Sequence, residues 1–141
     1  MKADARIDAQ VRSTLRRLAD AYAARDLKAV MGCFAEDDDI VLYGTGADEK
    51  RVGPSEIRTQ VERDWAQTDR IAMVFERVSV AAAGRVAWAA VDGAFNVTVG
   101  GESGELSARI TFVLEERNGE WSIVHAHFSV PAAGQEEGHS I

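Results

Sequence analysis

The sequence predicts a single α+β domain in which three helices precede an antiparallel sheet. In the first third of the chain, apolar residues recur at spacings of three and four, as they do on one face of a helix. From residue 70 onward the pattern changes to long strand-like segments separated by glycine-containing breaks. A chain of 141 residues has the length of one domain. We therefore expect one folded unit over 1–131, followed by a flexible tail over 132–141.

The first two helices are predicted by apolar spacing and by an acidic residue ahead of each. The first begins near Asp4 or Ala5. Asp26 is placed as the N-cap of the second, because its carboxylate can accept a hydrogen bond from a free amide of the first turn. The apolar stripe of the first helix is Ile7, Val11, Leu15, Leu18 and Tyr22, and that of the second is Leu27, Val30, Met31 and Phe34.

The middle of the chain predicts a short strand, a loop and a third helix. Residues 40–43 form a β-type run, and the glycine-rich segment after it is expected to continue as a loop to Val52. Gly53 and Pro54 then open the third helix, since proline is well suited to a first helical turn. Its inner face is expected to carry Ile57, Val61 and Trp65.

Four long strands are expected at 70–81, 85–99, 105–117 and 121–130. Asn118-Gly119 is the strongest hairpin signal in the chain, because both residues tolerate positive φ. Short turns between consecutive strands predict an antiparallel meander.

Strand alternation sorts the side chains of the sheet into two faces. One side of each strand mixes apolar and polar members, and a helix-covered face of that kind is expected to surround a pocket. Both faces contain apolar residues, so the face without helices needs other cover, and a second copy of the chain is the economical one. The mixed sides carry Trp88 with Asp92, Arg109 with Thr111, and Trp121 and Ile123 with His125, His127 and Ser129.

Three segments, together with the order of the elements, carry a resemblance to a known family. They are FAEDDDIVLYGTGADEKRVG at 34–53, ARITFVLEERNGEW at 108–121 and IVHAHFSVP at 123–131. The chain resembles the SnoaL-like branch of the nuclear transport factor 2-like superfamily, and its last strand also resembles the association domain of calcium/calmodulin-dependent kinase II. The resemblance implies a cone-shaped fold with a bent sheet wrapped over the helices, an internal pocket and dimers formed through the sheet.

The same resemblance implies a choice of chemistries. The family includes a ketosteroid isomerase, polyketide cyclases, a dehydratase, an epoxide hydrolase and non-catalytic assembly domains. The aspartate base, tyrosine and protonated acid of the isomerases cannot be matched residue by residue onto this sequence. The resemblance therefore leaves the reaction open, and only the chemistry of individual residues can indicate it.

The candidate catalytic residues are Asp92, His125 and His127. Asp92 lies in the apolar run VAWAAVDGAFNV. It would act as a general base if it faced a desolvated pocket, or would pair with Arg109 on the neighbouring strand. His125 and His127 point to the same side of a strand. They would form hydrogen bonds within the sheet, contact a ligand as acid–base groups, or bind a metal if a third ligand joined them.

The candidate ligand-binding residues are Tyr43, Trp65, Trp88, Arg109 and Thr111. Arg109 would pair with Asp92 or bind a carboxylate-bearing ligand through its planar guanidinium. Trp65 and Trp88 would form pocket walls or pack in the core.

Composition limits the partners. The formal charge of −7 argues against nucleic acid, and no apolar window has the length of a membrane span. The one cysteine, Cys33, excludes an internal disulfide and a cysteine metal cage. We predict a cytoplasmic homodimer, without metal or cofactor, that binds a small, largely apolar organic ligand in an internal pocket. It would act as an isomerase, cyclase or dehydratase, or else as a non-catalytic sensing or assembly module.

Overall fold

The computed structural model describes residues 1–141, and its helices begin where their caps predict. Helix α1 (Ala5–Ala24) starts after Asp4, whose carboxylate accepts a hydrogen bond from the Ile7 amide at 2.8 Å. Helix α2 (Leu27–Met31) starts after Asp26, which accepts a hydrogen bond from the Ala29 amide at 3.1 Å. Helix α3 (Gly53–Ala66) has Pro54 in its first turn. The capped starts are therefore confirmed, although α2 ends three residues before Phe34.

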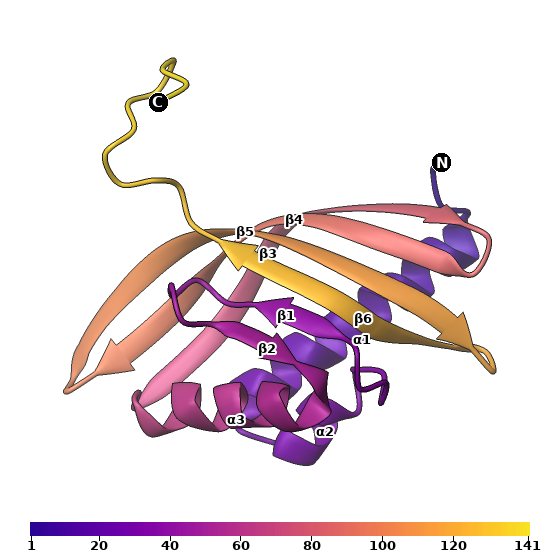
Figure 1. Ribbon diagram of the computed structural model, residues 1–141, viewed down its shortest axis with the longest axis horizontal. Helices are drawn as coiled ribbons and strands as arrows, with labels where there is room; N and C mark the ends of the chain where they lie inside the picture. Colours follow the sequence, from indigo (N-terminus) through magenta and orange to yellow (C-terminus); the bar gives the residue numbers. More distant parts are fainter.

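The sheet has six strands in the order β2-β1-β6-β5-β4-β3 (Figure 1). Its strands are β1 (Val41–Tyr43), β2 (Lys50–Val52), β3 (Arg70–Ala83), β4 (Val86–Val99), β5 (Glu102–Arg117) and β6 (Glu120–Ser129). Strands β3 to β6 form the expected antiparallel meander. Strand β1 joins β6 in parallel and pairs with β2 in antiparallel register. The expectation of a loop up to Val52 was wrong, because residues 50–52 form this edge strand.

A β-bulge corrects the predicted faces of strand β6. The register of β5 and β6 shifts between Val113 and Leu114, so that Val113 lies opposite His125 and Leu114 opposite Ile123. An extra residue in one strand reverses the side on which the following side chains lie. Trp121 and Ile123 are consequently buried, whereas they were predicted to share a face with His125.

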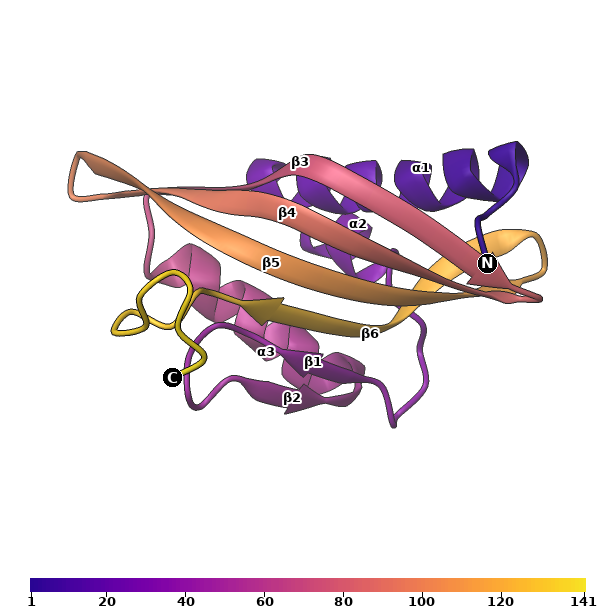
Figure 2. The ribbon, with the colours of Figure 1, turned by 90° about the horizontal axis from the view of Figure 1, so that it is seen from above.

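The helices cover one face of the sheet, called here the inner face. Figures 1 and 2 show α1 along β3 and α3 beneath the short strands β1 and β2; α1 is in contact with β3, and α3 with β2. The core lies between these layers and contains Leu15, Leu18, Ile57, Phe112 and Ile123, each at most 2% exposed. The opposite side, the outer face, is not covered by a helix (Figure 2).

The chain beyond β6 forms no helix or strand. From Pro131 onward its residues are exposed, and Figure 1 shows this segment leading away from the sheet. Its boundary with the domain stays a prediction. None of the three helices has the length and apolar character required to span a membrane.

Candidate functional site

A cavity of about 150 Å³ lies between the inner face and the helices. Eighteen residues line it and 13 of them are hydrophobic. They come from all layers of the fold and include Leu18, Leu42, Ile57, Val61, Ile71, Met73, Phe95, Val97, Leu106 and Phe128. A largely apolar cavity with a few polar groups is typical of small-molecule sites.

The polar groups of the cavity are connected by hydrogen bonds from three elements. The Tyr22 hydroxyl of α1 donates to Oδ2 of Asp64 at 2.8 Å, and Nε2 of Gln60 donates to Oδ1 of Asp64 at 2.8 Å. Arg51 of β2 donates from Nε to Oε1 of Gln60 at 2.8 Å. Tyr22 is 1% exposed and Gln60 is 5% exposed. The carboxylate of Asp64 is therefore held in one position at the wall of the cavity.

Burial changes the acid–base properties of this pair. Desolvation raises the pKa of Asp64 above its ordinary value, although hydrogen bonds from Tyr22 and Gln60 act in the opposite direction. Desolvation, together with the nearby Asp64 carboxylate, also raises the pKa of the Tyr22 hydroxyl far above its ordinary value. Tyr22 therefore stays protonated as a donor, and Asp64 is the member of the pair that can take up or release a proton.

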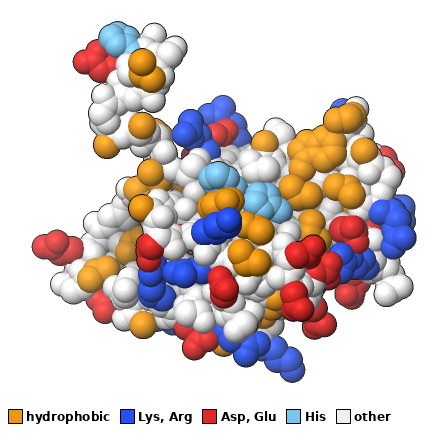
Figure 3. Space-filling view, viewed as in Figure 1, with side chains coloured by type: hydrophobic (Ala, Val, Ile, Leu, Met, Phe, Trp, Pro, Cys, Tyr) orange, Lys and Arg blue, Asp and Glu red, His pale blue; other side chains and the backbone are white.

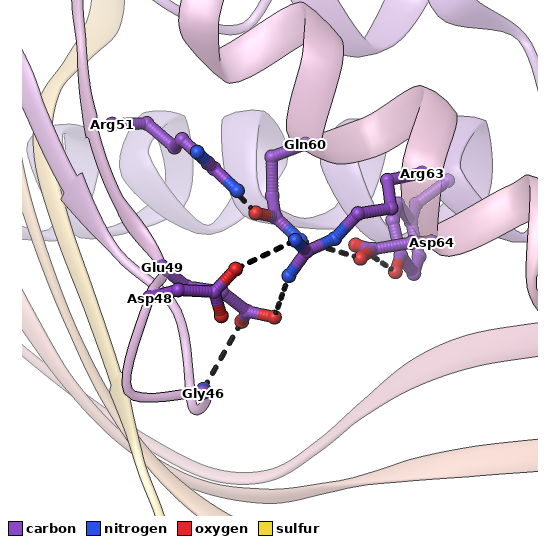
Figure 4. A network of polar contacts seen from close by, with 8 residues as sticks. Gly46, Asp48, Glu49, Arg51, Gln60, Arg63 and Asp64 are labelled. Carbon is purple, nitrogen blue, oxygen red and sulfur yellow. Dashed lines mark hydrogen bonds and ion pairs between the residues drawn. The ribbon is translucent and has the colours of Figure 1, made fainter.

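The rim of the cavity is formed by the loop between β1 and β2, where Gly44, Thr45 and Glu49 line it. Arg63 of α3 donates from Nη1 to Asp48 at 2.8 Å and from Nη2 to Glu49 at 2.7 Å (Figure 4). Glu49 also accepts a hydrogen bond from the Gly46 amide at 3.2 Å. The hydrogen bond from Arg63 lowers the pKa of Asp48. These contacts tie the loop to α3, directly beside Asp64.

The predicted catalytic residues lie together, but on the outer face. Asp92, His125 and His127 line an open groove of about 710 Å³ with Arg109 and Thr111, and none of the five lines the internal cavity. The mixed side of the strands is therefore the side without helices, contrary to the expectation that helices cover it. The catalytic role of these residues stays a prediction.

Their contacts on the outer face are those of surface side chains. Asp92 lies opposite Arg109 in the strand register, yet its ion pair is with Arg77, at 4.0 Å between exposed groups. His125 bonds through Nδ1 to the carbonyl oxygen of Val41 at 2.7 Å. The predicted ion pair of Asp92 with Arg109 was therefore wrong, because the partner of Asp92 is Arg77. The predicted hydrogen bond of His125 within the sheet is confirmed.

The aromatic candidates divide between the two faces. Tyr43 lies beside His127, with ring centroids 5.0 Å apart, and Figure 3 shows histidine side chains at this surface next to apolar and basic ones. Trp88 pairs in register with Val113 on the outer side of the sheet. Trp65 packs against Tyr22 and donates from Nε1 to the Tyr22 carbonyl oxygen at 3.1 Å, but it does not line the cavity.

Sequence reasoning missed Asp64, Tyr22 and Glu49 as site residues. A signal for Asp64 was present, because it follows Val61 by three positions and Ile57 by seven, which places it on the apolar side of α3. Tyr22 was assigned only to the apolar stripe of α1. Glu49 carried no local signal, since its position depends on the contact between its loop and Arg63.

The sequence profile of the SnoaL-like domain family matches residues 11–133, which is most of the chain. The chain belongs to the SnoaL-like domain family. The predicted fold class is confirmed by solved structures as well. A nuclear transport factor 2-like superfamily protein from Salmonella enterica is 19% identical with a TM-score of 0.83, covering 97% of this SnoaL-like chain and 100% of that one.

Two further solved structures differ in the roles suggested for them. A Streptomyces avermitilis protein, provisionally described as a dehydratase of the nuclear transport factor 2-like family, is 15% identical with a TM-score of 0.81, covering 89% of this chain and 97% of that one. A Xanthomonas campestris protein, provisionally described as a calcium/calmodulin dependent protein kinase II association domain, is 26% identical with a TM-score of 0.76, covering 94% and 91%. No curated protein sequence matches the SnoaL-like chain.

Proposed function

We propose that this SnoaL-like protein binds a small, largely apolar organic molecule in the cavity under the inner face. The observation that carries the proposal is the apolar cavity with the Tyr22–Asp64 pair at its wall. A cavity of about 150 Å³ lined by apolar side chains is large enough to hold a molecule of the size of benzene. The ligand is therefore one six-membered ring, or an aliphatic group of similar volume, with a polar group directed at Asp64.

Asp64 gives this site a means of proton transfer without a cofactor. Its raised pKa brings the carboxyl group nearer to the operating pH, where a general acid or base is most effective. Tyr22 holds the carboxylate through a short hydrogen bond and stays protonated itself. Proton removal from carbon in an isomerase, or elimination in a dehydratase, needs a base of this kind. We propose Asp64 as that base.

The binding proposal can be tested with toluene, which has the right size and no polar group. Toluene added to the protein is expected to shift the methyl NMR signals of cavity residues such as Leu18, Val61 and Ile71. Val97→Phe, at the cavity wall, should abolish the shifts, whereas Val86→Phe on the exposed side of the same strand should not. Absence of shifts in the unmodified protein, or shifts confined to the outer face, would contradict the proposal.

A second candidate function is assembly through the outer face. Two large apolar side chains of this face, Tyr43 and Val86, are exposed at 37% and 38%. The similarity to the Xanthomonas protein described as an association domain supports the same reading. We propose that a second copy of the chain covers this face.

Sedimentation equilibrium measures this association directly. The unmodified chain is expected to sediment as a dimer and Trp88→Glu as a monomer, because a carboxylate would be buried in the contact without a partner. Arg58→Glu, on α3, is the control and should leave the dimer intact. A monomeric unmodified chain would remove the assembly function and leave the cavity proposal standing.

A further inference from the structure

The polar end of the cavity is richer in hydrogen-bond acceptors than in donors. The carboxylate of Asp64 offers about four acceptor positions, of which Tyr22 and Gln60 occupy two. The single hydroxyl proton of Tyr22 is used in that bond. Glu49 adds a second carboxylate to the lining. A ligand that brings only acceptors, such as a carboxylate or a carbonyl, would meet these two carboxylates, against which the lining sets the hydroxyl of Thr45 as a further donor.

The charged groups around the polar end of the cavity also disfavour a ligand that brings only acceptors. The lining contains Glu49 and Asp64 and no lysine, arginine or histidine. Arg63 does not line the cavity and pairs with Asp48 and Glu49, and Arg51 reaches the network only through Gln60. Three carboxylates and two guanidinium groups leave one negative charge in the network when Asp64 is ionised (Figure 4). Asp64 has no cation bonded to it, so its charge lacks a direct counter-charge.

We propose that the ligand of the cavity carries a protonated amine beside its apolar ring, and that this amine binds to Asp64. The inference rests on the proposed function in assuming that the cavity binds a ligand, and it names the chemical class. A carboxylate bonded to an ammonium group anchors the ligand, so this role of Asp64 and its role as a base are alternatives. An ammonium group brings up to three donors and one positive charge, which match the free acceptor positions and the one unbalanced negative charge. The apolar body of the ligand would lie against Leu18, Ile71 and Phe95, which line the remainder of the cavity.

Three probes that share one ring separate the ligand classes. Benzylamine is protonated at neutral pH, benzyl alcohol is neutral and benzoate is an anion. Their affinities for the unmodified protein are measured by NMR titration at pH 7 and low ionic strength. A charge-assisted hydrogen bond to a partly buried carboxylate predicts that benzylamine binds about tenfold or more tightly than benzyl alcohol. Benzoate is expected to bind more weakly than either.

Variants assign the preference to the cavity carboxylate. Asp64→Asn should reduce the preference for benzylamine over benzyl alcohol to near unity, whereas Glu62→Gln, at an exposed position of the same helix outside the cavity lining, should leave it unchanged. Equal binding of benzylamine and benzyl alcohol by the unmodified protein, or tighter binding of benzoate, would overturn the inference while the toluene shifts still supported the cavity. Failure of toluene and all three probes would instead overturn the proposed function itself.

Discussion

Two acidic residues on opposite sides of the sheet, Asp64 of α3 and Asp92 of β4, are in opposite situations. Asp64 lies against the inner face, where Tyr22 and Gln60 each donate a hydrogen bond of 2.8 Å to it. The side chain of Asp92 is 62% exposed on the outer face, and its ion pair with Arg77 is 4.0 Å long. A partly buried carboxylate is sensitive to each of its contacts, whereas an exposed one exchanges its partners for water at little cost. The inner face is therefore where small changes should have large effects.

The largest difference is expected between neighbouring residues of β5 that point to opposite faces. Phe112 is 0% exposed and packs edge-on against Phe128, with ring centroids 5.7 Å apart. Phe112→Ala should lower the free energy of unfolding by about 3–5 kcal/mol, because it leaves a void in the core. Thr111→Ala, on the outer face, should change it by no more than about 0.5 kcal/mol. Urea denaturation of both variants measures the difference, and similar losses would mean that the outer face is as tightly packed as the inner one.

A smaller difference is expected between the two tyrosines of the chain. Tyr22→Phe removes the donor to Oδ2 of Asp64 and should cost about 1–3 kcal/mol, since a partly buried carboxylate loses one of its hydrogen bonds. Tyr43→Phe changes an exposed ring on the outer face and should stay within about 0.5 kcal/mol. Thermal unfolding followed by circular dichroism compares the two. An unchanged melting temperature for Tyr22→Phe would show that the hydrogen bond to Asp64 contributes little to stability.

The same contrast explains what the sequence could and could not predict. Caps, apolar stripes and the Asn118-Gly119 turn depend on residues a few positions apart, so the helices and the four long strands were predicted close to their observed positions. The bulge opposite Val113 and Leu114 and the edge strand β2 depend on pairing between distant segments, and both were missed.

The site was harder to predict because apolar neighbours mean different things in strands and helices. Asp92 was favoured because it lies in an apolar run, but Val91 and Gly93 point to the other side of the strand and cannot bury it. Asp64 directly follows the charged residues Glu62 and Arg63 in sequence, yet it shares a helix face with Ile57 and Val61. Residues three and four positions away would have been the informative ones for the helix.

The smallest expected effect is on the pH dependence of stability, which should have opposite signs for the carboxyl groups of Asp64 and Asp37. Burial raises the pKa of Asp64 above its unfolded value of 3.8, so the folded state holds this proton more tightly than the unfolded state does. This contribution to stability is present at low pH and is lost as the pH rises through the folded pKa of Asp64. The hydrogen bond from Arg117 lowers the pKa of Asp37, so its contribution is present above the unfolded value and is lost as the pH falls.

Asparagine variants separate these two contributions when urea unfolding is measured between about pH 2 and pH 7. Relative to the unmodified protein, Asp64→Asn should become more stable as the pH rises, because it lacks the cost of ionising a buried carboxyl group. Asp37→Asn should become relatively less stable over the lower part of that range as the pH rises, because it lacks the ionised partner of Arg117. The charges facing Asp64 are those of Glu49, which opposes its ionisation, and Arg63, which favours it. If the two variants instead changed with pH in the same direction, desolvation of Asp64 would not be its dominant interaction, and its proposed role as a base would lose its physical support.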